Sequence, residues 1–280
     1  MERGPSANNK IRKLKYPLVM GILNLTVDSF SGDGVLDEMD VRDKVAQMLH
    51  DGVTCIDIGA ESTRPGATRV EERAEKEKVV AAIKIIRILS KDILISVDTT
   101  RASVARAAIE EGADIINDIS GGTFDPEMFR VIVENKNVFY VLGHVIGIFK
   151  TMHQSYGGNT IVEDAILFWK QKISELARLG VTSDRIICDP GIGFSKNLEE
   201  NCQLIKSAAH LVQNAGAPVL FGISRKRFIK TISESEDNDS LDKYSLFLHA
   251  CLLRDGVSII RTHEVKHTIN ALSIFKTTYA

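Results

Sequence analysis

Short, continuous apolar runs alternate along this chain with longer segments of helical period. The runs lie at 18–25, 55–58, 93–97, 115–119, 138–142, 186–188, 219–223 and 258–260. Continuous apolar runs are typical of strands buried on both faces, and strand–helix alternation predicts parallel strands joined by right-handed crossovers. About eight such units over roughly 250 residues predict an α/β fold, a single-domain (β/α)8 TIM barrel. A doubly wound open sheet is the alternative, but no G-x-G-x-x-G motif follows the first strand.

The composition is that of an ordinary globular chain. Of the 280 residues, 44% are hydrophobic and 26% are charged, and the formal net charge is −2. This balance gives no global field that favours nucleic acid, and no apolar run approaches the ~18 residues of a membrane helix. Four scattered cysteines without metal-type spacing predict reduced thiols and a cytoplasmic protein. We expect residues 1–16 to form a flexible N-terminal extension and residues 17–280 to form the barrel domain.

Every predicted strand ends in a polar or charged group. These groups are Asn24, Glu61 to Arg64, Asp98, Asn117 with Asp118, His144, Asp189, Ser224 to Arg227, and Arg261 to His263. A single aspartate after a strand is more often a helix N-cap than a catalyst. Eight strands that follow the same rule favour an active site, because the C-terminal ends of barrel strands meet at the face where active sites lie.

The groups at these strand ends are of two kinds. Asp98, Asn117 and Asp189 supply acceptors, which suit the adjacent N–H groups of a heterocycle such as a pterin or a guanine. The second set supplies cations and donors suited to a diphosphate, and it consists of Arg64, Lys226, Arg261 and His263, with Asn24. Together the two sets predict a nitrogen heterocycle that bears a phosphate. Phe194 is a candidate wall for an aromatic substrate, and core packing is its equal alternative.

Six motifs in a fixed order resemble those of a known family. They are MGILNLTVDSFSGDG, IDIGAESTRPGA, ISVDTTRASVARAAIEEGADIINDISGG, DPGIGFSKNLEEN, GISRKRFI and RTHEVKHT. With these motifs the chain resembles the dihydropteroate synthases of the pterin-binding (β/α)8 barrel family over nearly its whole length. Members of that family condense 6-hydroxymethyl-7,8-dihydropterin diphosphate with 4-aminobenzoate in folate biosynthesis, and they are sulfonamide targets. The resemblance therefore implies a transferase that releases diphosphate.

The resemblance also implies a role for each matching residue. Asp98, Asn117, Asp189 and Lys226 would hold the pterin. The diphosphate would be bound by Asn24, Arg64, Arg261 and His263, and Asn24 would also be a ligand of a Mg²⁺ cofactor. The aminobenzoate would be bordered by Phe30, Thr63, Pro65, Phe194, Ser224 and Arg227. The implied catalytic residues are Asp98, Lys226, Arg261 and His263.

Three residues near the predicted site depart from the family pattern. Gly143 stands where the family has a methionine that packs on the pterin, which predicts a gap at this position. Ile146 replaces an arginine of the family. Arg227 replaces a small residue that meets the aminobenzoate carboxylate, and it would either pair with that carboxylate more strongly or crowd the site.

Two alternative functions follow from these patterns. The three departures support a non-catalytic pterin-binding paralogue that keeps the fold. A pterin-binding methyltetrahydrofolate methyltransferase would share the acceptor set. Such an enzyme would need neither the run 62–65 nor the basic segments 224–226 and 261–263, which together favour the synthase.

The segment 241–256 carries more apolar residues than one helical face requires. Its apolar residues include Tyr244, Leu246, Phe247, Leu248, Cys251 and Leu252. The resemblance implies that the last helices pack in a homodimer, and this surplus agrees with that. We expect small-molecule substrates and a homodimer partner, with no nucleic acid and no membrane among the partners.

Overall fold

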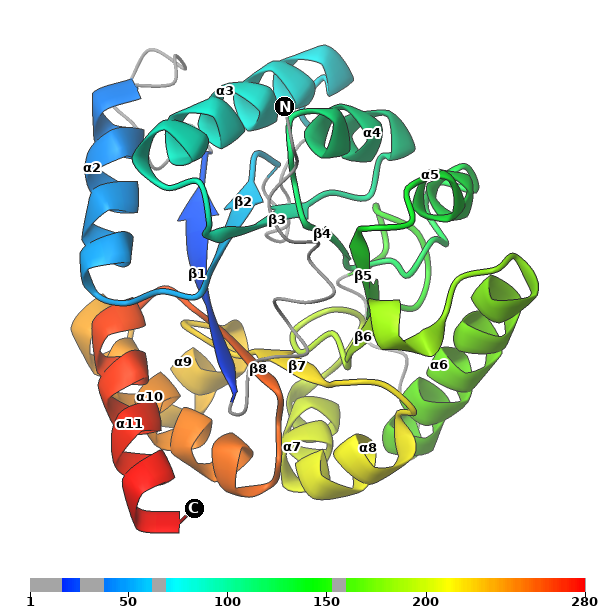
Figure 1. Cartoon of the computed structure of the whole chain (residues 1–280). Helices are drawn as coiled ribbons and strands as arrows, with labels where there is room; N and C mark the ends of the chain where they lie inside the picture. Colours follow the sequence, from blue (N-terminus) through cyan, green and yellow to red (C-terminus); the bar gives the residue numbers. More distant parts are fainter. Residues whose placement is uncertain (1–16, 26–37, 62–68, 153–159, 280) are drawn as a thin grey trace.

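The chain forms a ring of eight parallel strands surrounded by helices, as Figure 1 shows. The structure, a computed structural model, describes residues 17–25, 38–61, 69–152 and 160–279. Neighbouring strands follow the order β6-β5-β4-β3-β2-β1-β8-β7, and a parallel bridge between Cys188 and Val219 joins the two ends of this order. The strands are β1 (Leu18–Asn24), β2 (Cys55–Gly59), β3 (Leu94–Asp98), β4 (Ile115–Asp118), β5 (Phe139–Gly143), β6 (Ile186–Asp189), β7 (Leu220–Gly222) and β8 (Ile259–Thr262). The predicted (β/α)8 barrel is confirmed.

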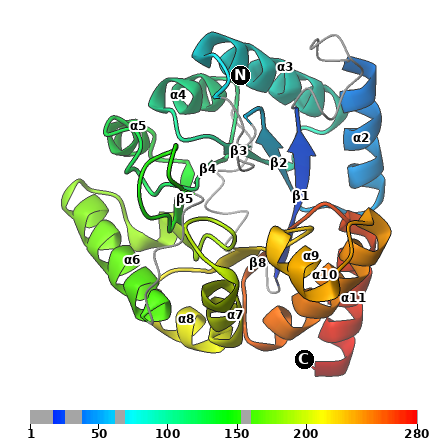
Figure 2. The same ribbon diagram turned by 180° about the vertical axis from the view of Figure 1, so that it is seen from behind.

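Helices cover the outside of the ring in both views (Figures 1 and 2). They are α2 (Glu38–His50), α3 (Glu72–Leu89), α4 (Ala102–Glu110), α5 (Met128–Glu134), α6 (Ile161–Arg178), α7 (Leu198–Lys206), α8 (Ala208–Asn214), α9 (Arg227–Ser233), α10 (Asn238–Arg254) and α11 (Val265–Tyr279), with a 3₁₀ turn η2 (Ser183–Arg185). A glycine of positive φ follows five of these helices two residues after the last helical residue, namely Gly52, Gly112, Gly180, Gly216 and Gly256. These glycines end the helices because they adopt the left-handed conformation without a Cβ penalty.

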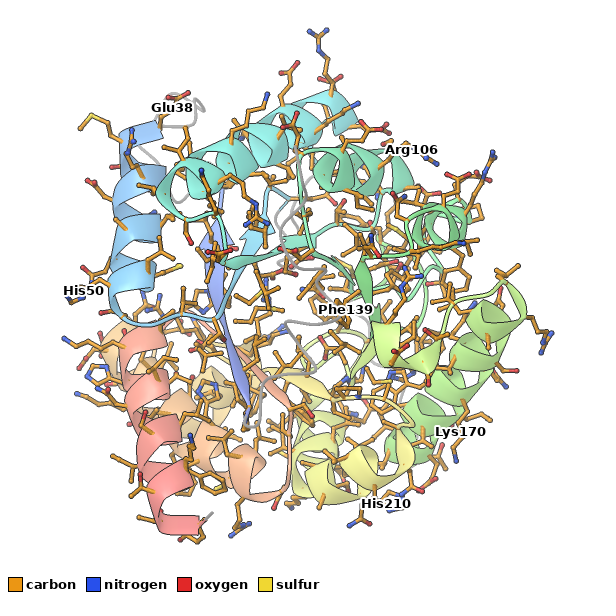
Figure 3. The ribbon with its side chains drawn as sticks, viewed as in Figure 1. Glu38, His50, Arg106, Phe139, Lys170 and His210 are labelled. Carbon is orange, nitrogen blue, oxygen red and sulfur yellow. The ribbon has the colours of Figure 1, made fainter. Side chains whose placement is uncertain are left out.

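The apolar core lies in two main layers. One layer fills the space between the outer face of the strands and the helices. The other plugs the barrel interior with residues from all eight strands: Leu18, Met20, Cys55, Leu94, Ile115, Phe139, Val141, Ile187, Leu220 and Ile259. In Figure 3, Phe139 lies at the barrel wall, whereas Glu38, His50, Arg106, Lys170 and His210 lie on the surrounding helices. The interior is therefore a packed core, as in other barrels of this size.

Helices α10 and α11 leave several large apolar side chains exposed. These helices pack against each other, as Figure 2 shows from behind. Phe247 on α10 is 69% exposed, and on α11 Ile274 and Tyr279 are 65% and 74% exposed. The surplus of apolar surface predicted for this region is present, and the homodimer stays a prediction. No helix in the described part of the chain combines the length and the apolar character needed to cross a membrane.

Candidate functional site

A polar layer lies directly above the apolar plug of the barrel. Side chains of a strand alternate between its two faces, so a residue two positions after a plug residue also points into the barrel. Cys55, Ile115 and Ile187 belong to the plug, and Asp57, Asn117 and Asp189 follow them by two positions. Arg261 follows Ile259 in the same way. The barrel topology therefore gathers carboxylates, an amide and a guanidinium at one level of the interior.

Arg261 joins two carboxylates at this level. Its Nε donates a hydrogen bond to Oδ2 of Asp57 at 2.6 Å, and Nη2 donates to Oδ2 of Asp98 at 2.9 Å. Burial acts to lower the pKa of Arg261, but the carboxylates of Asp57 and Asp98 bring that pKa above its ordinary value. Burial raises the pKa of Asp98 to about 7, although Arg261 opposes that rise. Arg261 and Asp98, which the sequence assigned to separate ends of the ligand, are thus in direct contact.

Asp57 is a site residue that the sequence reasoning missed. Its side chain is fully buried, and Oδ2 accepts a second hydrogen bond from Nδ2 of Asn117 at 3.2 Å. Asp57 is the one residue of the run 55–58 that is not apolar. Because candidate site residues were taken only from the ends of the predicted strands, Asp57, which lies inside a strand, was not among them. The two-residue alternation within the strand is the signal that would have found it.

The loop after β6 holds Asp189 in a tight turn. Oδ1 of Asp189 accepts the backbone N–H of Gly191 at 2.8 Å, and burial raises the pKa of this carboxyl. A Cβ at Gly191 would lie 2.2 Å from the backbone oxygen of His144, and Gly191 has a φ of 66°. The glycine is therefore required by the close approach of the β5 loop, which is a reason independent of any ligand.

Lys226 reaches into the same loop from the turn before α9. Its ammonium group donates a hydrogen bond to the backbone oxygen of Ile192 and lies 4.2 Å from the centroid of the Phe194 ring. Burial lowers the pKa of Lys226 to about 8, while Asp189 acts in the opposite direction. Phe194 is 9% exposed and is thus a packing residue, and its role as a wall for an aromatic substrate stays a prediction.

Lys196 is a second buried cation that the sequence reasoning did not single out. It is 8% exposed, and its Nζ donates to the backbone oxygens of His144 and Phe194, each at 2.9 Å. Burial lowers its pKa to about 7. Lys196 therefore ties the β6 loop to the end of β5. A lysine seven residues after a strand gives no sequence signal for such a bridge.

The gap predicted at Gly143 is not present, and that prediction was wrong. A Cβ at Gly143 would lie 2.4 Å from both Cα and the backbone oxygen of Ile119. The backbone that follows β4 fills the space that a larger side chain would need. Ile119 packs with Val145, Met152 and Phe194 in a small apolar cluster. An apolar wall is thus built from the loops after β4, β5 and β6 instead of from residue 143.

Ser224 and His263 form a pair at the ends of β7 and β8. Oγ of Ser224 lies 3.0 Å from Nδ1 of His263, and the same hydroxyl oxygen accepts the backbone N–H of His263 at 3.2 Å. The two residues had been assigned to different substrates, and the structure brings them together. Arg227 is exposed and begins α9, so its predicted contact with aminobenzoate stays a prediction.

Four of the predicted site residues lie outside the described part of the chain. They are Phe30, Thr63, Arg64 and Pro65. The residues that flank the segment 62–68 are described, and Oε1 of Glu61 accepts the backbone N–H of Val70 at 3.0 Å. Nη2 of Arg101 donates to Oε1 of Glu61 at 3.1 Å and to the backbone oxygen of Val70 at 2.6 Å.

Asn24 offers an oxygen ligand at the end of β1. Its Oδ1 lies 3.6 Å, and Oδ2 of Asp98 3.9 Å, from the position that a Cβ of Gly59 would take. Amide and carboxylate oxygens are ligands that Mg²⁺ accepts, and Mg²⁺ in phosphate-binding sites commonly uses only one or two protein ligands. Among the residues that the structure describes, no group of three or more His, Cys, Asp or Glu side chains could hold a metal ion. The amide oxygen of Asn24 thus has the chemistry of one such ligand, and the metal stays a prediction.

The chain is similar in sequence to proteins of folate synthesis. The profile of the family described as pterin binding enzyme matches residues 20–263. The chain is 36% identical over 270 residues to the folate synthesis bifunctional protein of Arabidopsis thaliana, a match that covers 92% of this chain and 56% of that protein. It is 38% identical over 253 residues to the dihydropteroate synthase of Synechocystis sp., covering 90% of this chain and 86% of that protein. The chain thus spans about half of the plant protein and most of the Synechocystis protein.

The fold is also similar to that of solved structures. The dihydropteroate synthase of Xanthomonas albilineans, determined with 4-aminobenzoic acid, superposes with a TM-score of 0.87 at 31% sequence identity. The superposition covers 95% of this chain and 94% of that chain. The similarity of fold therefore extends over nearly the whole chain.

Proposed function

The chain belongs to the pterin-binding enzyme family, and from that premise we propose that it is a dihydropteroate synthase. The reaction is the condensation of 6-hydroxymethyl-7,8-dihydropterin diphosphate with 4-aminobenzoate to 7,8-dihydropteroate and diphosphate. One observation carries the proposal: identity of 38% with the Synechocystis synthase extends over 90% of this chain. The buried polar layer at the C-terminal face of the barrel supports it, because this layer combines acceptors for a heterocycle with cations for an anion.

Different residues of the polar layer suit the two parts of the pterin substrate, the ring and the diphosphate. Asp98, Asn117 and Asp189 supply oxygen acceptors for the N–H edge of the ring. Lys226 and Arg261 add positive charge at the same level, which suits the oxygen atoms of the leaving diphosphate. Asn24 and the Ser224–His263 pair lie at neighbouring strand ends and extend the set of donors.

The reaction joins the amine nitrogen of aminobenzoate to the methylene carbon of the pterin. The bond between that carbon and the diphosphate oxygen breaks, and diphosphate leaves with the electron pair. Positive charge then develops on the ring and methylene, where the carboxylate of Asp98 stabilises it in a site shielded from water. The amine attacks as the neutral base and loses its proton afterwards, so no strong general base is assigned.

Mg²⁺ is the cofactor that this proposal includes. Asn24 would hold the ion, and Asp98 is the described carboxylate nearest to the same position beside Gly59. When bound, Mg²⁺ neutralises charge on the diphosphate and makes it a better leaving group. Arg261 adds positive charge to the same region, and its Nη2 donates to Oδ2 of Asp98, the oxygen that lies 3.9 Å from the Gly59 position.

The proposal extends to assembly and compartment. The exposed apolar residues of α10 and α11 support a homodimer through these helices. Cys55, Cys188, Cys202 and Cys251 are all free thiols, which supports a reducing, cytoplasmic environment.

Diphosphate release tests the proposed function. Purified protein is given Mg²⁺, the pterin diphosphate and 4-aminobenzoate, and each is omitted in turn. Release that needs all three, with dihydropteroate formed, is the expected result. Pterin binding without release would favour the non-catalytic paralogue. Methyl transfer from methyltetrahydrofolate to a corrinoid protein would favour the methyltransferase instead.

A further inference from the structure

Asp57 is the most deeply buried carboxylate of the polar layer. Its side chain has no exposed surface, and its Oδ2 accepts hydrogen bonds from both Arg261 and Asn117. A buried carboxylate of this kind persists only when donors or a cation compensate for its lost hydration. Because it is fully buried beneath residues assigned to the substrate, Asp57 acts on the site through its two partners.

The bond to Asn117 fixes the orientation of that side-chain amide. An asparagine has a donor end and an acceptor end, and the hydrogen bonds around it decide which way each end points. An ionised carboxylate only accepts, so Asp57 selects the amide nitrogen of Asn117. The opposite end, Oδ1 of Asn117, is buried and has no hydrogen-bond partner among the described residues. Asn117 therefore keeps its oxygen available as an acceptor.

The bond to Arg261 fixes the guanidinium in the same way. Asp57 accepts from Nε and Asp98 from Nη2, so two carboxylates hold the planar group at two points. The side chain of Arg261 is 16% exposed and that of Asp57 is not exposed at all. A guanidinium held at two points loses its freedom to rotate and presents its remaining donors in one direction.

We infer that Asp57 is a positioning residue that orients Asn117 as a hydrogen-bond acceptor and holds Arg261 for the pterin diphosphate. The inference rests on the proposed function, because it assigns both partners to that substrate. Asp57 itself makes no contact with the reacting atoms. Its effect is to fix the orientation of Asn117 and Arg261 before the ligand binds.

The variant Asp57→Asn tests this inference without changing the shape of the side chain. The side-chain amide of asparagine both donates and accepts hydrogen bonds, so residue 57 would no longer determine which end of the Asn117 amide faces it. The variant also lacks the negative charge that holds Arg261. The matched control is Ser96→Ala. Ser96 faces Asp57 in the β2–β3 register, is fully buried, and has an Oγ without a hydrogen-bond partner among the described residues.

The measurement is the binding of 6-hydroxymethylpterin by calorimetry, with thermal unfolding recorded for each variant. We expect Asp57→Asn to weaken pterin binding about tenfold or more, as the loss of an oriented acceptor requires, and Ser96→Ala to leave it within about twofold. In the Asn117→Ala background, the same Asp57→Asn change should weaken binding much less, because the amide that it orients is absent. The KM for the pterin diphosphate should rise more than the KM for 4-aminobenzoate.

The possible outcomes separate the inference from the function on which it rests. A wild-type chain that does not bind 6-hydroxymethylpterin overturns both. A wild-type chain that binds it, together with an Asp57→Asn variant of unchanged affinity, overturns only the role of Asp57. An undiminished effect of Asp57→Asn in the Asn117→Ala background overturns the orientation of Asn117. Equal losses in Asp57→Asn and Ser96→Ala would mean that any change at this level disturbs the barrel, and would also overturn the inference.

Discussion

The ammonium nitrogen of Lys226 lies 4.2 Å from the centroid of the Phe194 ring, and this contact joins the end of β7 to the loop after β6. A cation over an aromatic face is stabilised by the ring quadrupole, and the partial burial of Lys226 strengthens that attraction. The resemblance to the synthases had assigned Lys226 to the pterin and Phe194 to the aminobenzoate. Their contact places one positive charge at the boundary between the two proposed subsites.

We expect Lys226→Ala to lower kcat/KM by about 10²-fold or more, since one charge-assisted contact in the transition state is lost. Because burial lowers the pKa of Lys226 to about 8, wild-type activity that needs the ammonium form should fall as the pH rises through that value. Steady-state assays of diphosphate release between pH 6 and 10 measure both effects. Lys230→Ala is the control, because Lys230 lies four residues later, on α9, and pairs with Glu236 at the surface. A variant at Lys226 with normal rates would remove this residue from catalysis.

Gly143 and Gly222 form a matched pair for testing how tightly the barrel mouth is packed. A Cβ at Gly143 would lie 2.4 Å from the backbone of Ile119, whereas a Cβ at Gly222 would first meet Cδ of Arg261 at 3.6 Å. We expect Gly143→Ala to lower the free energy of unfolding by about 1–3 kcal/mol, the range for overpacking, and Gly222→Ala to change it by less. Urea unfolding checks both. Equal stabilities would mean that the backbone after β4 moves away freely from β5.

Two buried histidines predict how stability depends on pH. Burial lowers the pKa of both His144 and His249 to about 3. In the unfolded chain a histidine takes up a proton near pH 6.5, so between that pH and about 3 the unfolded state binds more protons than the folded state. The contribution of each ring is therefore fully present above pH 6.5 and is lost as the pH falls, by about 1.4 kcal/mol per pH unit.

Replacing one of the two histidines should remove its contribution to the pH dependence of the unfolding free energy. We expect His249→Gln to flatten the fall in unfolding free energy between pH 6 and 4 by about the slope of one proton. The comparison variant is His50→Gln, which removes an imidazole whose side chain is 80% exposed. Denaturant titrations at several pH values give the slopes. If His249→Gln keeps the wild-type slope, the buried ring of His249 is not the source of the dependence.

The barrel could be predicted from the sequence because its strands are buried on both faces. Each apolar run matched a strand to within two residues, and the strand ends brought Asp98, Asn117, Asp189 and Arg261 to one level. Periodicity alone could not show which of these groups pair with one another. The contact between Arg261 and Asp98 depends on the register of strands far apart in the sequence.

Other features of the site were predicted wrongly or missed, each for its own physical reason. The gap expected at Gly143 was wrong, since the backbone at Ile119 comes within 2.4 Å of the position that its Cβ would take. Lys196 was missed because its partners are backbone oxygens, which carry no residue-type signal. Asp57 was missed because one carboxylate inside an apolar run was read as part of the strand.

Arg101 is the centre of a buried ionic network at the base of the segment 62–68. It is 9% exposed and donates hydrogen bonds to Glu61, to Glu75 and to the backbone oxygen of Val70. Glu75 is 1% exposed and also accepts from Oγ1 of Thr99 at 2.6 Å. Removing the cation would take from the buried Glu75 its charged partner and would leave Glu61 with Arg69, whose Nε lies 3.6 Å from Oε1 of Glu61.

We expect Arg101→Met to lower the free energy of unfolding by about 3–5 kcal/mol, the range for removing one partner of a buried ion pair. The further change Glu75→Gln in that variant should recover part of the loss, because it removes the uncompensated charge of Glu75. Arg106→Met on α4, which begins directly after Arg101, is the control, since Arg106 pairs with Glu134 at 2.7 Å and its side chain is 44% exposed. Thermal and urea unfolding of all four proteins measure these effects. A loss in Arg101→Met no larger than that in Arg106→Met would show that Arg101 does not hold the base of the segment.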